Sequence, residues 1–131
     1  MSKAPQNLKY TKSHEWIKVE GDGSIIIGIT DNAQNLMGDM VFVDLPKIGT
    51  KVAAGKDCVV VESVKAASDV YAPVAGEIVE VNDSVVDAPE TLNKDPYGKG
   101  WLFRLKPTNK ADVDKLLDAT AYDKLVAAEK H

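Results

Sequence analysis

Short apolar runs, interrupted by glycine, proline and asparagine or aspartate, make up most of the chain before Pro107. Runs rich in valine and isoleucine suit a pleated, half-buried surface, and glycine and proline interrupt extended segments, so this pattern is typical of β-strands. The predicted strands cover residues 16–19, 24–30, 40–45, the surroundings of Val52, 58–64, 70–71 and 77–81. Pro107 ends this β region.

Helical signals are few, and most of them lie near the C-terminus. Asp31 can cap one short helical turn over 32–36. Thr108 or Asn109 can cap a helix over 112–117, and Thr120 can cap another over 122–128. A chain of 131 residues has the usual size of one domain. The pattern therefore predicts a single, mainly β domain over 1–131, a β-sandwich or flattened barrel with a short helix and C-terminal helices.

A weak internal repeat has an offset of 33 residues. It aligns residues 49–55 with 82–88, so that Val52 matches Val85, and it aligns Leu45 with Ile78. Such a repeat predicts two similar β-units packed against each other.

Composition and charge exclude several classes of partner. Sixteen basic and twenty acidic residues give a net charge of −4, whereas nucleic-acid binding depends on clustered lysine and arginine. No apolar stretch approaches the ~18 residues of a membrane span. The first ten residues lack the features of a signal peptide or an organelle presequence, which makes the bacterial cytoplasm the expected location and the mature mitochondrial form a lesser alternative.

Cys58 is the only cysteine, which excludes an internal disulfide and suits a reducing compartment. Because it lies in an apolar run of valines, we interpret it as a buried small side chain rather than a reactive thiol.

Two segments resemble enzyme motifs only in part. Residues 49–57 begin like a phosphate-binding loop, but the glycines are one residue too far apart and Asp57 replaces the hydroxyl that magnesium needs. His14 and Glu15 begin like a zinc-protease helix, but Lys18 occupies the place of the second histidine. The sequence offers no plausible set of nucleophile, base and orienting group, and no metal site is expected.

Residues 62–73 present a different kind of candidate. A β-rich run reaches Lys65, continues through Ala66 and Ala67, and resumes toward Pro73. This order predicts a lysine at the tip of a hairpin, whose amine can be made into an amide and whose small neighbours leave room for a modifying enzyme. By pattern alone, a lysine on a turn is usually just a solvated charge, and the pattern does not by itself favour a modified lysine.

The segment resembles the attachment region of lipoyl carrier domains, and the chain as a whole resembles the glycine cleavage H-protein family. The blocks that carry this resemblance are residues 13–16, 28–34, 38–46, 72–77 and 93–101, in the family's order. Met40 and Asp44 differ from the residues most expected at their positions. Biotin carriers bracket their lysine with methionines, whereas Val64 and Ala66 flank Lys65 here, which favours lipoate.

The resemblance implies a lipoyl-domain-like β-sandwich, or barrel-sandwich hybrid, that acts as a non-catalytic carrier with lipoate attached to Lys65. It implies that glycine decarboxylase (the P-protein) loads an aminomethyl group onto this arm. It further implies that aminomethyltransferase (the T-protein) removes the group and that dihydrolipoamide dehydrogenase (the L-protein) reoxidises the arm. A lipoyl ligase or octanoyltransferase must first attach the group, and the carrier is expected to be a monomer.

The family also implies a cleft for the loaded arm, formed by Ser13, Glu15 and Asp69. From the residues alone, 14–16 is a strand edge with Trp16 in the core, and we interpret Trp16 as structural and Glu15 as functional. A carboxylate near the amine of the loaded arm would favour its charged form. Two alternatives remain open at this point: a carrier that relays lipoate to 2-oxoacid dehydrogenase complexes, and an interaction module that has lost its modification.

Overall fold

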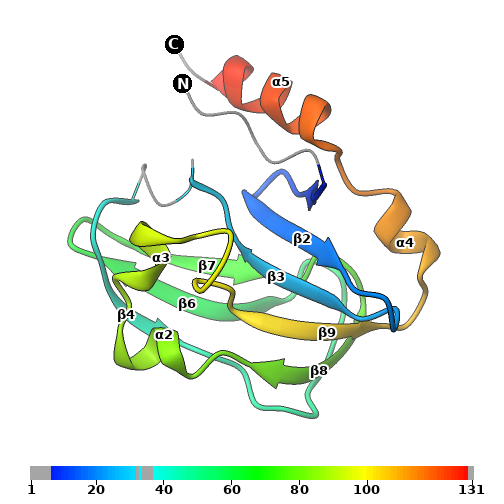
Figure 1. The fold of residues 1–131 in the computed structure, drawn as a ribbon, viewed down its shortest axis with the longest axis horizontal. Coiled ribbons are helices and arrows are strands. Elements are labelled where there is room, and N and C mark those ends of the chain that lie inside the picture. The colour runs from blue at the N-terminus through cyan, green and yellow to red at the C-terminus, as the bar shows by residue number, and fades with distance from the viewer. Residues whose placement is uncertain (1–6, 32, 34–36, 130–131) are drawn as a thin grey trace.

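The strands form two antiparallel sheets in the computed structural model, which describes residues 7–31, 33 and 37–129 (Figure 1). The larger sheet has the order β1-β2-β3-β9-β8-β5, and the smaller has the order β4-β6-β7. The strands are β1 Lys9–Tyr10, β2 Glu15–Val19, β3 Ile25–Ile29, β4 Met40–Asp44, β5 Lys51–Val52, β6 Asp57–Ser63, β7 Ala67–Tyr71, β8 Gly76–Val81 and β9 Phe103–Pro107. This arrangement confirms the predicted β-sandwich, and the two sheets do not close into a barrel across the described part of the chain.

The main core lies between the two sheets, because alternate side chains of each strand point inward. Ile25 and Ile27 of β3 are fully buried, as are Ile78 of β8 and Leu105 of β9. Valines of β4, β6 and β7 cover them from the smaller sheet. The register of β2 and β3 also requires a glycine, because Gly28 lies opposite Trp16. A Cβ at Gly28 would lie 2.6 Å from the indole ring.

The seven predicted strands match β2 to β8 in order, with shifts at their ends, whereas β1 and β9 were not predicted as strands. Val64 was expected in a strand but lies in the turn after β6. β1 was not predicted, because a two-residue strand carries almost no periodic signal. β9 ends at Pro107, where the β region was predicted to end.

The described helices are α2 Ser84–Asp87, α3 Thr91–Lys94, α4 Ala111–Asp114 and α5 Ala119–Glu129. Two C-terminal helices are confirmed, although α4 ends at Asp114 rather than at the predicted residue 117, and the Asn109 side chain accepts a hydrogen bond from Ala111 N at 3.0 Å. The expected cap at Thr120 is wrong: the Asp118 carboxylate accepts the bond from Ala121 N at 2.8 Å. Most of the helical turn predicted over 32–36 lies outside the described residues.

The prediction of two similar β-units from the 33-residue repeat is wrong. Val52 lies in β5, whereas Val85 is a buried residue of α2. Equivalent positions of the repeat therefore adopt different local structures.

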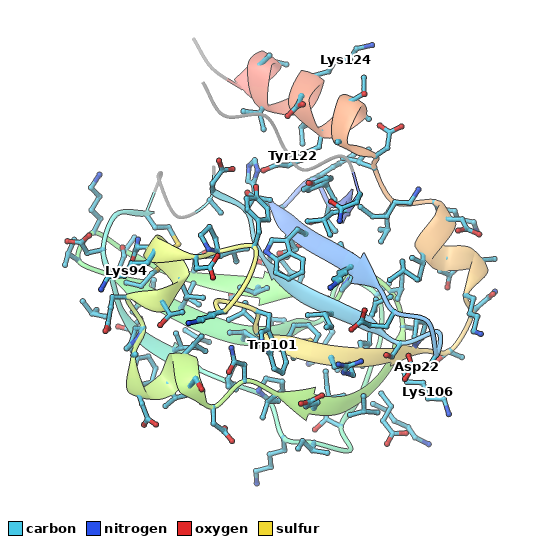
Figure 2. All side chains as sticks on the ribbon, in the orientation of Figure 1. Asp22, Lys94, Trp101, Lys106, Tyr122 and Lys124 are labelled. Atoms are coloured by element: carbon cyan, nitrogen blue, oxygen red, sulfur yellow. The ribbon has the colours of Figure 1, made fainter. Side chains whose placement is uncertain are left out.

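A second apolar cluster joins α5 to the start of the larger sheet. The rings of Tyr10 and Tyr122 stack with their centroids 4.7 Å apart. Tyr122, labelled in Figure 2, also hydrogen-bonds Thr30 Oγ1 and His14 Nδ1 through its hydroxyl, each at 2.7 Å. Among the described residues, no helix has the length and apolar character that crossing a membrane requires.

Candidate functional site

Lys65 lies in the turn of the β6–β7 hairpin, as predicted. Glu62 and Ala67 are the last paired residues, and residues 63–66 form the turn. Ser63 N donates to Ala66 O at 2.8 Å. Ser63 Oγ accepts hydrogen bonds from the backbone N–H groups of Lys65 and Ala66, each at 3.1 Å. The Ser63 hydroxyl therefore takes the place of further backbone pairing and holds the turn closed.

The Lys65 side chain is available for covalent attachment. Val64, Lys65, Ala66 and Ala67 are all exposed, and the exposed fraction of Val64 is 67%. Within the described residues, the Lys65 ammonium forms neither an ion pair nor a hydrogen bond. An amine on a flexible stem between small side chains can reach into the active site of another protein, so these residues fit a covalently attached group.

Ser13 and Glu15 lie together at the beginning of β2. Glu15 is only 1% exposed, although it carries a carboxylate. Its Oε1 accepts a hydrogen bond from Ser13 Oγ at 2.6 Å and another from Thr11 Oγ1. Its Oε2 accepts a bond from Tyr71 N at 3.2 Å. A buried carboxylate needs such donors, because an unpaired one would be expensive to keep out of water.

Thr11 was missed by the sequence analysis. Besides its side-chain bond to Glu15, Thr11 accepts a hydrogen bond from Glu15 N at its Oγ1, 3.1 Å away, and Thr11 N donates to Glu15 O at 3.0 Å. Residues 11–15 thus form a closed loop, in which His14 has a φ of 69°. A threonine four residues before the glutamate was the available signal, since threonine hydroxyls often bond to nearby backbone groups.

A pocket of about 560 Å³ opens beside this loop. Ser13 and Glu15 line it together with Tyr71 and Pro73 from the end of the hairpin, and Lys115 and Leu116 close its far side. Asp69 does not line this pocket. It is exposed on β7, four residues after Lys65 and two before Tyr71. The structure brings Ser13 and Glu15 together and leaves Asp69 outside their pocket, on β7 between Lys65 and Tyr71 in the chain.

The other chemical candidates lie elsewhere. Residues 49–57 run from a turn through β5 into β6, with no helix to complete a phosphate-binding loop. The described residues contain no group of three or more metal-ligating side chains that could hold an ion. Cys58 is half-buried, its Sγ lies 3.4 Å from Lys56 O, and burial raises the pKa of its thiol to about 11.

A β-sandwich that displays an exposed lysine on a tight hairpin turn fits the class of carrier proteins. Comparison with known proteins agrees. The family profile described as "Glycine cleavage H-protein" matches residues 8–129. The "Glycine cleavage system H protein" of Cronobacter sakazakii is 59% identical over 129 residues, covering 98% of this chain and 100% of the relative. That of Citrobacter koseri is 58% identical over the same shares.

A solved structure gives the same result at the level of the fold. The crystal structure of a glycine cleavage system H protein from Mycobacterium marinum matches with a TM-score of 0.87 and 45% identity, over 95% of this chain and 99% of that chain. The chain belongs to the glycine cleavage H-protein family, whose members are the non-catalytic lipoyl-carrier component of the glycine cleavage system.

Proposed function

We propose that Lys65 carries a lipoyl group in amide linkage and that the chain shuttles an aminomethyl group from glycine decarboxylase to aminomethyltransferase. Dihydrolipoamide dehydrogenase completes the cycle by reoxidising the arm, and a lipoyl ligase or octanoyltransferase attaches it. The proposed compartment is the bacterial cytoplasm. The observation that carries the proposal is the position of Lys65, exposed and unpaired at the closed turn of residues 63–66, in a chain of this family.

The chemistry resides in the attached group, whose dithiolane supplies a sulfur that takes up the transferred unit and a disulfide that is reduced and restored. The chain itself presents the lysine. The β6–β7 ladder fixes the base of the hairpin, and the Ser63 hydroxyl fixes its tip. Exposed Ala66 and Ala67 leave the lysine open to a partner's active site.

We further propose that Ser13, Glu15 and Asp69 dock the loaded arm. Along the chain, Asp69 lies on β7 between the attachment point and Tyr71, which lines the pocket, and its exposed carboxylate can meet a cationic amine. Ser13 is exposed at the pocket, and Glu15 lies buried behind it with its carboxylate already hydrogen-bonded. We therefore assign direct contact with the arm to Asp69 and Ser13, while Glu15 supplies negative charge from below.

The proposal is tested by intact mass and peptide mapping after incubation with a lipoylating enzyme. The mass should rise by one lipoyl group, on the peptide that contains Lys65. Lys65→Arg keeps the positive charge but cannot form the amide, so both the mass shift and activity in a reconstituted glycine cleavage assay should vanish. Lys56→Arg is the matched control, because Lys56 is exposed at the other end of the same hairpin. Modification and activity of Lys65→Arg through another lysine would overturn the assignment.

A further inference from the structure

The tip that carries Lys65 is supported by one short segment of the chain, residues 38–40. Val64 N donates a hydrogen bond to Asp39 O at 3.0 Å. The stem of Lys65 lies against Gly38: a Cβ at that glycine would be in ordinary van der Waals contact with Lys65 Cε, at 3.5 Å. Lys65 follows Val64 directly. A shift of Asp39 would therefore also shift the backbone of the turn and the direction in which the Lys65 side chain points.

Asn93 holds this segment from the side of α3. Its Nδ2 donates to Gly38 O at 2.9 Å, and its Oδ1 accepts from Met40 N at 2.9 Å. The two bonds flank Asp39, so one carboxamide fixes the peptide groups on both sides of the residue that supports the tip. The planar carboxamide offers a donor and an acceptor side by side, as these two bonds require.

Asn93 can hold residues 38–40 in place because its own helix, α3, is packed against the main core. The preceding residue, Leu92, is fully buried in the main core. Asp95 N, just after α3, donates to Thr91 O at 2.9 Å and ends the helix. Figure 2 labels Lys94, the last residue of α3, at the same end of the molecule as the hairpin tip shown in Figure 1. The position of the tip is thereby linked to the core through Asn93.

We infer that Asn93 is a positioning residue for modification of Lys65: its carboxamide fixes residues 38–40 and thereby the direction in which the lysine is presented to the modifying enzyme. This inference rests on the proposed function, in which Lys65 is the attachment site. Without the two bonds, the tip would spend only part of its time in the presented orientation. The apparent affinity of the modifying enzyme would fall by that fraction, while the rate within the complex would change little.

The test compares Asn93→Asp with a matched control, Asn82→Asp. The Nδ2 of Asn82 donates to Lys99 O at 2.8 Å and to Trp101 O at 2.7 Å, and its Oδ1 accepts from Ser84 N at 3.3 Å, but none of these bonds reaches residues 38–40. Either substitution replaces a donor by a carboxylate oxygen that faces a carbonyl. Each should lower stability, so all assays are run below both melting temperatures.

The first readout is the modification of full-length protein by a lipoate ligase with lipoate and ATP. For Asn93→Asp, KM for the carrier should rise about tenfold, with kcat changed less than about twofold, which corresponds to about 1.4 kcal/mol in kcat/KM. For Asn82→Asp, both constants should match wild type. A wild-type KM for Asn93→Asp, or an equal rise for Asn82→Asp, would overturn the inference.

The second readout does not depend on modification. Amide hydrogen exchange at Val64 should accelerate at least about tenfold in Asn93→Asp, while exchange at Val61 in the centre of β6 stays as in wild type. Unchanged exchange at Val64 would overturn the inference even if modification slowed. Failure of the ligase to modify wild type would instead count against the proposed function. If Asn93→Asp does not fold, Asn93→Ala removes both bonds without adding charge and is held to the same outcomes.

Discussion

The backbone N–H of Tyr71 donates a hydrogen bond to Oε2 of Glu15, 3.2 Å away. Tyr71 ends β7, an edge strand of the smaller sheet, and Glu15 begins β2 of the larger sheet. An edge strand carries backbone groups that point away from its only neighbour and need other partners. Here a buried carboxylate supplies the acceptor, and it links the two sheets beside the pocket.

We predict that Glu15→Ala lowers the free energy of unfolding by about 2 kcal/mol. The substitution removes the acceptor shared by Thr11, Ser13 and Tyr71, and each buried donor left unpaired costs about 1–3 kcal/mol, less where water can replace the lost acceptor. Urea denaturation followed by circular dichroism measures the loss. Glu90→Ala, at an exposed residue, is the control and should change stability by less than about 0.5 kcal/mol. A loss for Glu15→Ala no greater than that of the control would show that the carboxylate does not link the sheets.

The sequence predicted those elements whose physical cause is local. Alternating β-branched runs indicated most strands, and small residues around Lys65 indicated an accessible turn. It could not predict α2 and α3, because these short helices have no side-chain cap and depend on tertiary packing, as the burial of Val85 and Leu92 shows, whereas Asn109 gave a cap signal for α4. It also could not show that Glu15 is buried, since its three donors come from Thr11, Ser13 and Tyr71, and Tyr71 is 56 residues away. The predicted cap of α5, Thr120, lies two residues after the observed cap, Asp118, which is the usual uncertainty in the position of a helix end.

Two tyrosines should make the fold sensitive to alkali. Burial raises the pKa of Tyr10 well above its ordinary value of 10.0, and the charges of Asp123 and Asp31 add to this effect. Burial also raises the pKa of Tyr97, whose hydroxyl donates to Asp31 Oδ1 at 2.8 Å. Both groups stay protonated in the folded state, whereas in the unfolded state they ionise near pH 10. Their contribution is therefore complete below about pH 10 and is lost as the pH rises above it, by up to about 1.4 kcal/mol per pH unit for each tyrosine.

Denaturation at a series of alkaline pH values measures this slope. Tyr97→Phe should reduce the slope above about pH 10, because one of the two groups no longer ionises on unfolding. Val64→Ala, at an exposed residue without an ionisable side chain, is the control and should leave the slope unchanged. A slope that is the same in all three proteins would mean that Tyr97 is not kept neutral by the fold.

Cys58 should be a slow nucleophile in the folded protein. Burial is the main cause that raises its pKa to about 11, and the neighbouring Asp57 carboxylate adds to it. At pH 8 such a thiol is about one part in a thousand thiolate, compared with about one part in four for a free cysteine. Alkylation by iodoacetamide should therefore be at least about a hundredfold slower in buffer than in urea. Asp57→Asn should increase the rate only slightly, and a native rate close to the rate in urea would refute the assignment.

The chain should unfold as one cooperative unit without help from a metal or a disulfide. The two apolar clusters share strand β2, because Trp16 belongs to the cluster under α5 and Ile17 belongs to the main core. Separation of the clusters would require β2 to leave one of them. Calorimetric and van't Hoff enthalpies should therefore agree. Reductant and chelator should leave the melting temperature unchanged, and either two transitions or a fall of several degrees with one of these reagents would contradict the expectation.

The proposed docking of the loaded arm leads to the last prediction, which concerns how long the transferred unit survives. The amine of the aminomethyl group must stay protonated if this group is to resist hydrolysis from the arm, and a nearby carboxylate favours the protonated form. A charge-assisted hydrogen bond contributes about 1.5–3 kcal/mol, but exposure of Asp69 reduces the expected gain to about 1 kcal/mol or less. Asp69→Asn should therefore leave lipoylation intact and shorten the lifetime by up to about fivefold.

Asp44→Asn is the control, because Asp44 is an exposed acid on the same sheet, beyond β6. Release of formaldehyde and ammonia without the aminomethyltransferase measures each lifetime. Equal decay in wild type, Asp69→Asn and Asp44→Asn would show that Asp69 does not protect the arm, whereas faster decay in Asp69→Asn alone would assign the contact to this carboxylate.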